Sequence, residues 1–278
     1  MKLSNKIRHV EANGLGRDFV MGDVHGCFSL IEAALVLLHF DPAKDRLFSL
    51  GDLIDRGPES AQVAQFLQQP GIYGQRGNHE DHLLSLMGYD AARAAQVVPE
   101  AFTTAELNHL YDNFGLGWWF ELSARQKQDI AEALLALPLL SEIHTPRGTV
   151  GLVHAEVPPG MGWAEFKEAI EAGDPAVRNA ALWGRSRQRL NDASGVPGVG
   201  RIFCGHSIVN KVTALGNVYY LDTGAFLSAQ FSNAGALSLV DIMTKTAALT
   251  VRPDSLFVHL NLVDGPCSKT PYSVYHRE

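Results

Sequence analysis

Three short segments of this chain place acidic, amide and imidazole side chains between glycines. They are residues 22–26 (GDVHG), 51–57 (GDLIDRG) and 77–80 (GNHE). Each segment follows a short apolar run that predicts a β-strand. Oxygen and imidazole ligands held at several strand ends are typical of a hydrolytic site that binds two metal ions. The residue types therefore indicate an enzyme.

Six residues are candidate metal ligands, each expected directly after a strand: Asp23, His25, Asp52, Asn78, His154 and His206. Asp23 and His25 alternate with Val24, so both side chains would share one face if the strand continued through them. Asp52 has two carboxylate oxygens and can bridge cations roughly 3.5–4 Å apart. The mixed nitrogen and oxygen set favours two divalent ions, Mn first and then Fe or Zn, over Mg alone.

Each of these residues has an ordinary structural explanation when taken alone. An aspartate in a Gly-Asp turn usually caps a helix or forms an Asx-turn. A single histidine such as His154 is more often hydrogen-bonded in a core than bound to a metal. Five strand ends that all carry Asp, Asn or His have no such common explanation, so we favour the metal site.

Four more residues supply the other parts of a phosphate-transfer site. His79 follows Asn78 and is placed to give a proton to a leaving alkoxide, and Asp55 can orient it. Arg56 and Arg185 can hold phosphate oxygens through paired hydrogen bonds. Taken alone, Arg185 would be a surface residue of an arginine-rich stretch.

The first third of the chain predicts a β-α-β-α-β order. We expect strands at 19–21, 47–50 and 72–75, and helices at 28–40, 59–68 and 80–87, with Ser29 as an N-cap. This order brings the three glycine-flanked segments to the carboxyl ends of neighbouring strands.

The later chain predicts a helical insertion and a second group of strands. Residues 90–137 form either an insertion that covers one side of the site or ordinary helices packed on the sheet. Strands are expected at 149–153, 201–204 and 218–221, and a hairpin at 236–251, which suggests a second sheet packed on the first. The tail at 253–278 gives little signal. We expect an α/β (or α+β) fold in a single domain spanning 1–278.

Composition excludes several classes of protein. The net charge of −7 and the pI near 5.9 argue against nucleic acid as a partner. Three cysteines, at 27, 204 and 267, fit reduced thiols better than disulfides. Residues 1–18 lack the apolar core of a signal peptide, and the apolar stretch at 31–40 is too short for a bilayer. We expect a cytoplasmic protein with no membrane partner.

The motif set resembles the phosphoprotein phosphatase branch of the calcineurin-like metallophosphoesterases. It is most similar to the lambda-phage-type and bacterial serine/threonine protein phosphatases. The later segments 115–120 (GLGWWF), 182–185 (LWGR), 205–207 (GHS) and 221–225 (LDTGA) are similar to that group as well. The resemblance runs in order from about residue 19 to residue 240.

This resemblance implies two packed β-sheets flanked by helices, with two metal ions at the strand ends. One ion would be held by Asp23, His25 and Asp52, and the other by Asp52, Asn78, His154 and His206. A hydroxide bridging the ions would attack phosphorus in line. His79, paired with Asp55, would protonate the leaving group while Arg56 and Arg185 hold the phosphoryl oxygens. The substrates would be phosphorylated proteins or peptides.

Two other functions stay open. A sister group hydrolyses dinucleoside tetraphosphates symmetrically; its second motif lacks the aspartate at Asp55 and its third ends in Asp where this chain has Glu80. Those residues favour the protein phosphatase, whereas Pro58 is a feature of the sister group. The third function is a catalytically silent module that binds phosphorylated partners. It is disfavoured because no candidate ligand or acid is missing.

Overall fold

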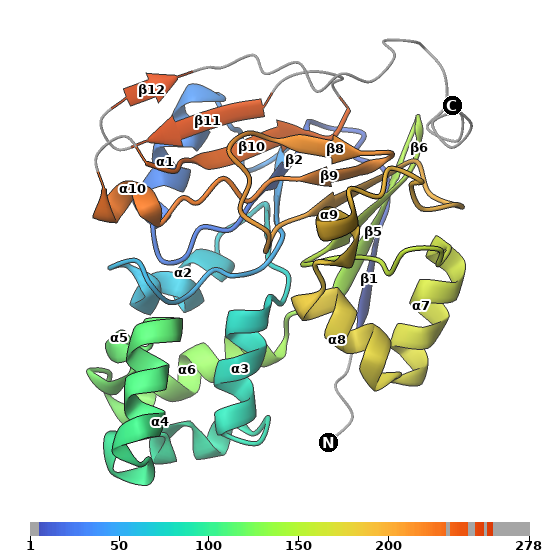
Figure 1. Cartoon of the computed structure of the whole chain (residues 1–278). Helices are drawn as coiled ribbons and strands as arrows, with labels where there is room; N and C mark the ends of the chain where they lie inside the picture. The colour runs from blue at the N-terminus through green and yellow to red at the C-terminus, as the bar shows by residue number, and fades with distance from the viewer. Residues whose placement is uncertain (1–5, 232–233, 244–247, 253–254, 258–278) are drawn as a thin grey trace.

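The computed structural model describes residues 6–231, 234–243, 248–252 and 255–257, in which two six-stranded sheets pack face to face (Figure 1). The first sheet has the order β12-β11-β10-β2-β3-β4. Its strands β2, β3 and β4 are parallel, and β10 joins β2 in the antiparallel direction. The bounds are β2 Asp18–Met21, β3 Arg46–Ser49, β4 Ile72–Tyr73, β10 Leu237–Asp241, β11 Ala248–Arg252 and β12 Ser255–Phe257.

The second sheet has the order β1-β5-β6-β7-β9-β8. Strands β6, β7 and β9 are parallel neighbours, so their carboxyl ends lie at one edge. The bounds are β1 Ile7–Val10, β5 Leu140–Thr145, β6 Gly148–Val153, β7 Arg201–Cys204, β8 Thr213–Leu215 and β9 Val218–Tyr220.

The alternation of side chains along the strands explains the layers. Val20 and Phe48 point between the sheets and form a core with Phe203 and Tyr219 of the second sheet. Their neighbours Phe19, Met21 and Leu47 point the other way, into a core shared with helices. Strands that are apolar on both faces need a layer on each side, so helices cover the outer faces.

The helices cover each sheet separately. α1 and α2 contribute to the core of the first sheet, and α7 and α8 to the core of the second. The bounds are α1 Phe28–Leu37, α2 Val63–Leu67 after a 3₁₀ turn at Ser60–Gln62, α3 Asn78–Leu86, α7 Trp163–Ala172, α8 Pro175–Trp183, α9 Ser186–Leu190 and α10 Leu227–Gln230. Among the described residues, no helix is long and apolar enough to cross a membrane.

The middle segment is helical, as expected, but its helices are short. They are 3₁₀ turns at Ala91–Gln96 and Pro99–Ala101, α4 Thr104–His109, a π-helical turn at Leu110–Phe114, α5 Gly117–Phe120 and α6 Ala124–Leu135. α6 contacts α2 and α3, and Figure 1 shows α4, α5 and α6 gathered beside α3. Gly115 ends the π-helical turn in the left-handed conformation. The limits of a single domain over 1–278 stay a prediction.

The structure corrects several expected boundaries. Ser29 lies inside α1 and is not its N-cap; its backbone N–H donates to Glu59 Oε2 at 2.8 Å, so a distant carboxylate caps the helix. α1 ends at Leu37, three residues before the expected end. The expected hairpin exists as β10–β11, but it extends the first sheet, while β1 and β5 complete the second. Most of the tail at 253–278 lies outside the described residues.

Candidate active site

Residues that follow β2, β3, β4 and β7 line one cavity of about 430 Å³, together with residues at the end of α8 and in the middle helical segment. Seven of the ten candidate residues line it: His25, Asp52, Arg56, Asn78, His79, Arg185 and His206. The other three, Asp23, Asp55 and His154, are at most 2% exposed. The ends of the first three expected strands and the two later histidines therefore meet, although they belong to different sheets.

Backbone strain is concentrated at these residues. Five of the ten candidates have positive φ, a region that residues with a Cβ rarely adopt: His25, Asp52, Asp55, Arg56 and His206, with φ between 46° and 73°. Such conformations persist where surrounding contacts fix them, and they cluster at functional sites. The structure also corrects the expectation that Asp23 and His25 share one face of a continuing strand. β2 ends at Met21, and His25 has positive φ, so the two residues do not alternate along a strand.

Two glycines allow the backbone to approach the carboxylates. A Cβ at Gly205 would overlap Asp23 Oδ1, and a Cβ at Gly77 would overlap Asp52 Oδ1. With these glycines in place, His206 N–H donates to Asp23 Oδ2 at 2.7 Å and His79 N–H donates to Asp52 Oδ1 at 3.0 Å. Glycine is thus needed at these two positions, because any side chain there would overlap a carboxylate of the site.

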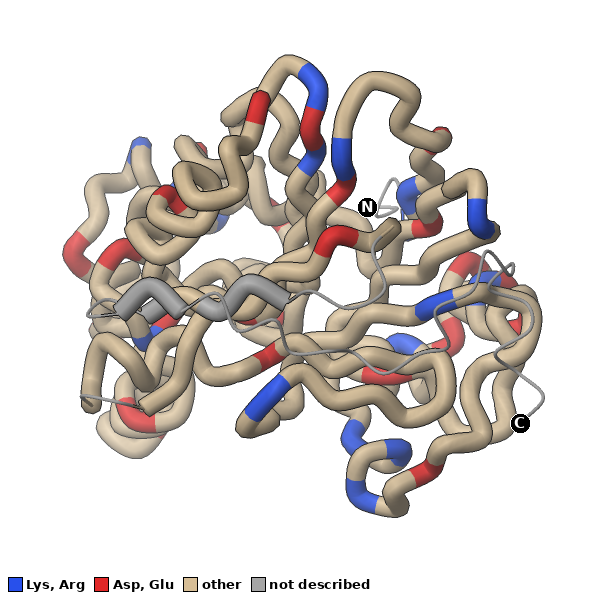
Figure 2. The backbone as a smooth tube through the Cα atoms, turned by 90° about the horizontal axis from the view of Figure 1, so that it is seen from above, with Lys and Arg blue, Asp and Glu red and all other residues tan. Residues whose placement is uncertain are grey.

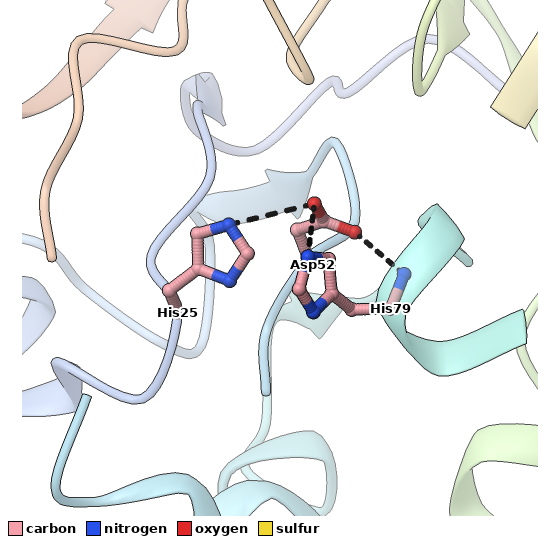
Figure 3. A group of neighbouring side chains, drawn as sticks. All are labelled: His25, Asp52 and His79. Atoms are coloured by element: carbon pink, nitrogen blue, oxygen red, sulfur yellow. Dashed lines mark hydrogen bonds and ion pairs between the residues drawn. The ribbon is translucent and has the colours of Figure 1, made fainter. Parts of the chain in front are cut away.

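Asp52 lies at the centre of the site (Figure 3). Its Oδ2 is 3.5 Å from His25 Nε2 and 3.9 Å from His79 Nε2, and its Oδ1 is 3.4 Å from His154 Nε2. Two triads place one ligand atom per residue within 4.8 Å: Asp52 with His25 and His79, and Asp52 with His154 and His206. Asp52 is common to both, which is the arrangement that a bridging carboxylate requires.

Backbone carbonyls orient the imidazoles. His25 Nδ1 lies 2.9 Å from the Ile54 carbonyl, and His154 Nδ1 lies 2.8 Å from the Leu50 carbonyl. A carbonyl can only accept, so both Nδ1 atoms carry the proton and both Nε2 lone pairs face Asp52. A second hydrogen bond that fixes the tautomer in this way is characteristic of histidines that bind metals.

The remaining donor atoms also fit a cation. Asn78 Oδ1 lies 2.8 Å from both His154 Nε2 and His206 Nδ1. Because His154 carries its proton on Nδ1, its Nε2 and Asn78 Oδ1 are two acceptors that face each other. Asp23 Oδ1 and His206 Nε2 are buried and have no hydrogen-bond partner. Buried polar groups are rarely left unpaired, and a cation would satisfy all of them. These residues therefore suit divalent ions, although Asp23 belongs to neither triad.

His79 is held by a buried carboxylate. Its Nδ1 lies 2.7 Å from Asp55 Oδ2, and the other oxygen of Asp55 accepts from Trp118 Nε1 at 2.8 Å. Asp55 and His79 are 1% and 2% exposed. Trp118 therefore contacts the site through Asp55, whereas Trp119 is a core residue with 0% exposure.

Both candidate arginines reach the cavity. Arg56 places NH1 3.1 Å from His25 Nε2 and NH2 3.2 Å from His79 Nε2, with its guanidinium 4.6 Å from the centre of the Phe226 ring. Arg185 donates to Ser207 Oγ at 3.2 Å. The two guanidinium groups come from different sheets, so the cavity between them can hold an anion.

A family model described as Calcineurin-like phosphoesterase matches residues 19–210, more than half of the chain. The chain belongs to this family. It is therefore a hydrolase that acts on phosphate esters, and the expectation drawn from the motif set is confirmed.

Relatives of this phosphoesterase include protein phosphatases and dinucleoside tetraphosphatases. Serine/threonine-protein phosphatase 1 of Salmonella typhimurium is 30% identical over 231 residues, which is 82% of this chain and 95% of the relative. The symmetrical bis(5'-nucleosyl)-tetraphosphatase of Methylococcus capsulatus is 32% identical over 178 residues, 63% of this chain and 55% of the relative. A solved serine/threonine phosphatase from Saccharomyces cerevisiae has a TM-score of 0.54 at 15% identity, covering 97% of this chain and 87% of that one, which shows the shared fold.

Burial and neighbouring charges set the ionisation of the phosphoesterase site. Burial lowers the pKa of His25, His154 and His206, to about 3 for His206. Burial raises the pKa of Asp52, but the surrounding imidazoles, His154 first, lower it below its ordinary value. Burial also lowers the pKa of His79, yet Asp52 and Asp55 together raise it above its ordinary value.

Over the chain as a whole, Lys and Arg are interspersed with Asp and Glu along the backbone (Figure 2).

Two buried acids of the phosphoesterase site had no assigned role in the sequence argument. Glu80 is fully buried and accepts backbone hydrogen bonds from Asp52, Leu53, Ile54 and Gly77 at 2.7–3.3 Å. Burial and the Asp52 charge raise its pKa to about 7. Asp222 follows β9 and is 2% exposed, and burial raises its pKa to about 6. The Leu-Asp-Thr-Gly segment after an expected strand is the sequence feature that could have identified Asp222 as a site residue. The hydrogen bonds of Glu80 can be found only from the fold.

Proposed function

We propose that this phosphoesterase is a serine/threonine protein phosphatase of the cytoplasm that uses two divalent ions, with Mn as the favoured metal. The observation that carries the proposal is the buried His79–Asp55 pair beside Asp52, at 2.7 Å. A serine or threonine alkoxide is a poor leaving group and needs a proton as the P–O bond breaks. A positioned acid is therefore worth most for this class of substrate.

In the proposed mechanism Asp23, His25 and Asp52 would hold one ion, and Asp52, Asn78, His154 and His206 would hold the other. Bound there, the ions would supply a nucleophilic hydroxide at neutral pH and neutralise charge that develops on phosphorus. Arg56 and Arg185 hold the phosphoryl oxygens from two sides of the cavity, which fixes phosphorus for in-line attack.

The proton reaches the leaving oxygen from His79. Its Nδ1 is paired with Asp55, so Nε2 is the ring nitrogen left for the substrate, and in the protonated imidazole it carries the proton that can be given away. Asp52 and Asp55 raise the pKa of His79 and so favour the protonated form that can act as an acid. Trp118 binds the second oxygen of Asp55 and keeps the carboxylate directed at the imidazole.

Symmetrical hydrolysis of dinucleoside tetraphosphates is the second candidate. The relative named for that activity in Methylococcus capsulatus and the proline at position 58 support it. Its match spans 55% of that relative, against 95% for the Salmonella phosphatase. Asp55 and Glu80 favour the protein phosphatase, because the sister group is expected to lack the first and to have Asp at the second position.

The test is phosphate release by Mn-loaded protein from a phosphoserine peptide and from diadenosine tetraphosphate in parallel, with a metal-stripped control. We expect metal-dependent turnover of the peptide at a kcat/KM well above that for the dinucleotide. A preference for the dinucleotide would contradict the proposal and support the sister function. Metal binding with no turnover of either substrate would support the silent binding module.

A further inference from the structure

One wall of the cavity is made by residues that the proposed mechanism does not use. His109 and Asn113 line the same cavity as His79 and come from the insertion. His109 ends α4, and Asn113 lies in the π-helical turn that follows it. π-helical turns are rare in proteins, and those that occur are often found at functional sites.

Phe114 connects this wall to the proposed acid. Its ring centre lies 5.2 Å from that of His79 and 5.5 Å from that of His109, and its side chain is buried. Gly115, next in the chain, packs against the backbone of Arg56. The wall is thus fixed on the side of the cavity where His79 would meet the leaving oxygen. His109 and Asn113 are therefore within the cavity that a group attached to that oxygen would enter.

The polar groups of this wall suit an amide. Asn113 Nδ2 donates to His109 Nδ1 at 2.6 Å, so Nδ1 is the acceptor in this pair and Nε2–H is left as a donor. Both residues are exposed. The second N–H and the carbonyl oxygen of Asn113, together with His109 Nε2–H, present donors beside an acceptor. A peptide bond presents the complementary C=O and N–H.

Two exposed apolar side chains line the cavity near His206. Trp183 is 40% exposed and Ile208 is 45% exposed, and the Trp183 ring centre lies 6.0 Å from that of His206. The Phe114 ring lies 6.4 Å from the Trp183 ring, so the apolar surface is continuous with the polar wall. Large apolar side chains exposed together in a cavity favour an apolar ligand group.

We propose that His109 and Asn113 bind a main-chain amide flanking the phosphorylated residue of a peptide substrate, and that Trp183 and Ile208 receive an apolar side chain of that peptide. This inference rests on the proposed function, because it takes a phosphopeptide as the substrate. An aryl phosphate has no such amide and would not use the subsite. The subsite would therefore change the preference for peptides over small phosphate esters.

The experiment compares kcat/KM for a phosphoserine peptide with kcat/KM for p-nitrophenyl phosphate, using Mn-loaded full-length protein. In Asn113→Ala we expect the ratio of the two values to fall about fivefold to tenfold, as for the loss of one or two neutral hydrogen bonds. His109→Ala should lower the ratio in the same direction. Asp112→Ala is the matched control: Asp112 is exposed on the same π-helical turn and outside the cavity lining, so the ratio should stay at the wild-type value.

A second measurement changes the substrate and leaves the protein intact. Peptides in which one or the other amide next to phosphoserine is N-methylated should be poorer substrates of the wild type, with a loss of similar size at one of the two positions. No loss at either position, or an equal loss on both substrates in Asn113→Ala, would overturn the inference. A wild type that cleaves the peptide while Asn113→Ala keeps the wild-type ratio overturns the inference alone. A wild type that cleaves only diadenosine tetraphosphate overturns the proposed function together with it.

Discussion

At the scale of single residues, Asp52 links the two groups of candidate metal ligands. Three imidazole Nε2 atoms lie within 3.9 Å of its two oxygens, and each oxygen faces a different triad. Those imidazoles hold the pKa of Asp52 low against the effect of burial. An ionised carboxylate shared between two sets of ligands is what distinguishes a two-metal site from two separate ones.

Asp52→Asn should lower phosphatase activity more than about 100-fold, because Asp52 would contact both ions directly. Losing a residue that only hydrogen-bonds to a metal ligand already lowers metal affinity or activity about 10–100-fold. The activity is measured at saturating Mn, and the bound metal is counted after gel filtration. Activity close to the wild type with two metals bound would contradict the bridging role. His144→Ala, an exposed histidine in β5, is the matched control and should behave as wild type.

His79→Asn should distinguish substrates by their leaving groups. The loss should reach about 100-fold or more on a phosphoserine peptide, whose alkoxide needs a proton. It should be much smaller on p-nitrophenyl phosphate, whose phenolate leaves without one. The measurement is kcat/KM on both substrates for the variant and the wild type. Equal losses on the two would show that His79 is not the general acid.

At the scale of elements, Glu80 joins the loop after β3 to the start of α3. One buried carboxylate accepts from three consecutive N–H groups of that loop and from Gly77, which precedes α3. Both segments carry candidate site residues, Asp52 on one and Asn78 on the other. The relative position of two strand ends thus depends on a side chain that does not face the cavity.

Glu80→Ala should destabilise the fold by at least about 3 kcal/mol, because four buried N–H groups lose their acceptor at once. We expect a lower midpoint of urea unfolding with an unchanged m-value. Glu59→Ala, which removes the carboxylate that caps α1, is the matched control with a loss of about 1 kcal/mol. A variant of Glu80 that unfolds at the wild-type midpoint would contradict this role.

A second link between elements makes stability depend on pH. Asp45, just before β3, accepts from Arg17 N–H at 2.8 Å and from the Arg17 guanidinium at 2.6 Å, just before β2. Burial raises the pKa of Asp45, but the Arg17 hydrogen bonds lower it to about 2, below the 3.8 of the free side chain. The ionised form therefore stabilises the fold above pH 4.

Asp45→Asn should lower the Tm at pH 7, and the difference from wild type should narrow as the pH falls from 4 toward 2. The sign follows from linkage: the unfolded chain takes up the proton first, so the stabilisation is lost as the pH falls through the folded pKa. Thermal unfolding of both proteins at pH 7, 5 and 3 measures it. A constant difference across that range would show that the charge of Asp45 is not involved.

At the scale of the whole molecule, the site lies where two sheets meet. Residues that follow β2, β3 and β4 of the first sheet and β7 of the second line the cavity, and neither sheet alone supplies both triads. Buried acids and imidazoles with unpaired atoms are gathered there, which disfavours the fold unless cations are bound. Metal binding should therefore stabilise the two-sheet arrangement as well as the reaction.

Removing metal with EDTA should lower the Tm by roughly 5 °C or more, since a ligand at 100 times its Kd contributes about 2.7 kcal/mol. Adding Mn back should restore the Tm. In Asp52→Asn the shift between EDTA and Mn should be much smaller. The same shift in the variant as in the wild type would mean that the stabilising ions bind elsewhere.

The sequence by itself determined the family, the strand-helix order of the first third and the ten candidate residues, because ligands, glycines and apolar runs are local patterns. Only the tertiary structure decided that β10 joins the first sheet and that Glu80 joins two strand ends. It also decided that His109 and Asn113 lie beside His79, and that His25 leaves the strand. These features depend on contacts between residues far apart in the chain, and the identity of a residue does not carry the position of its distant partners.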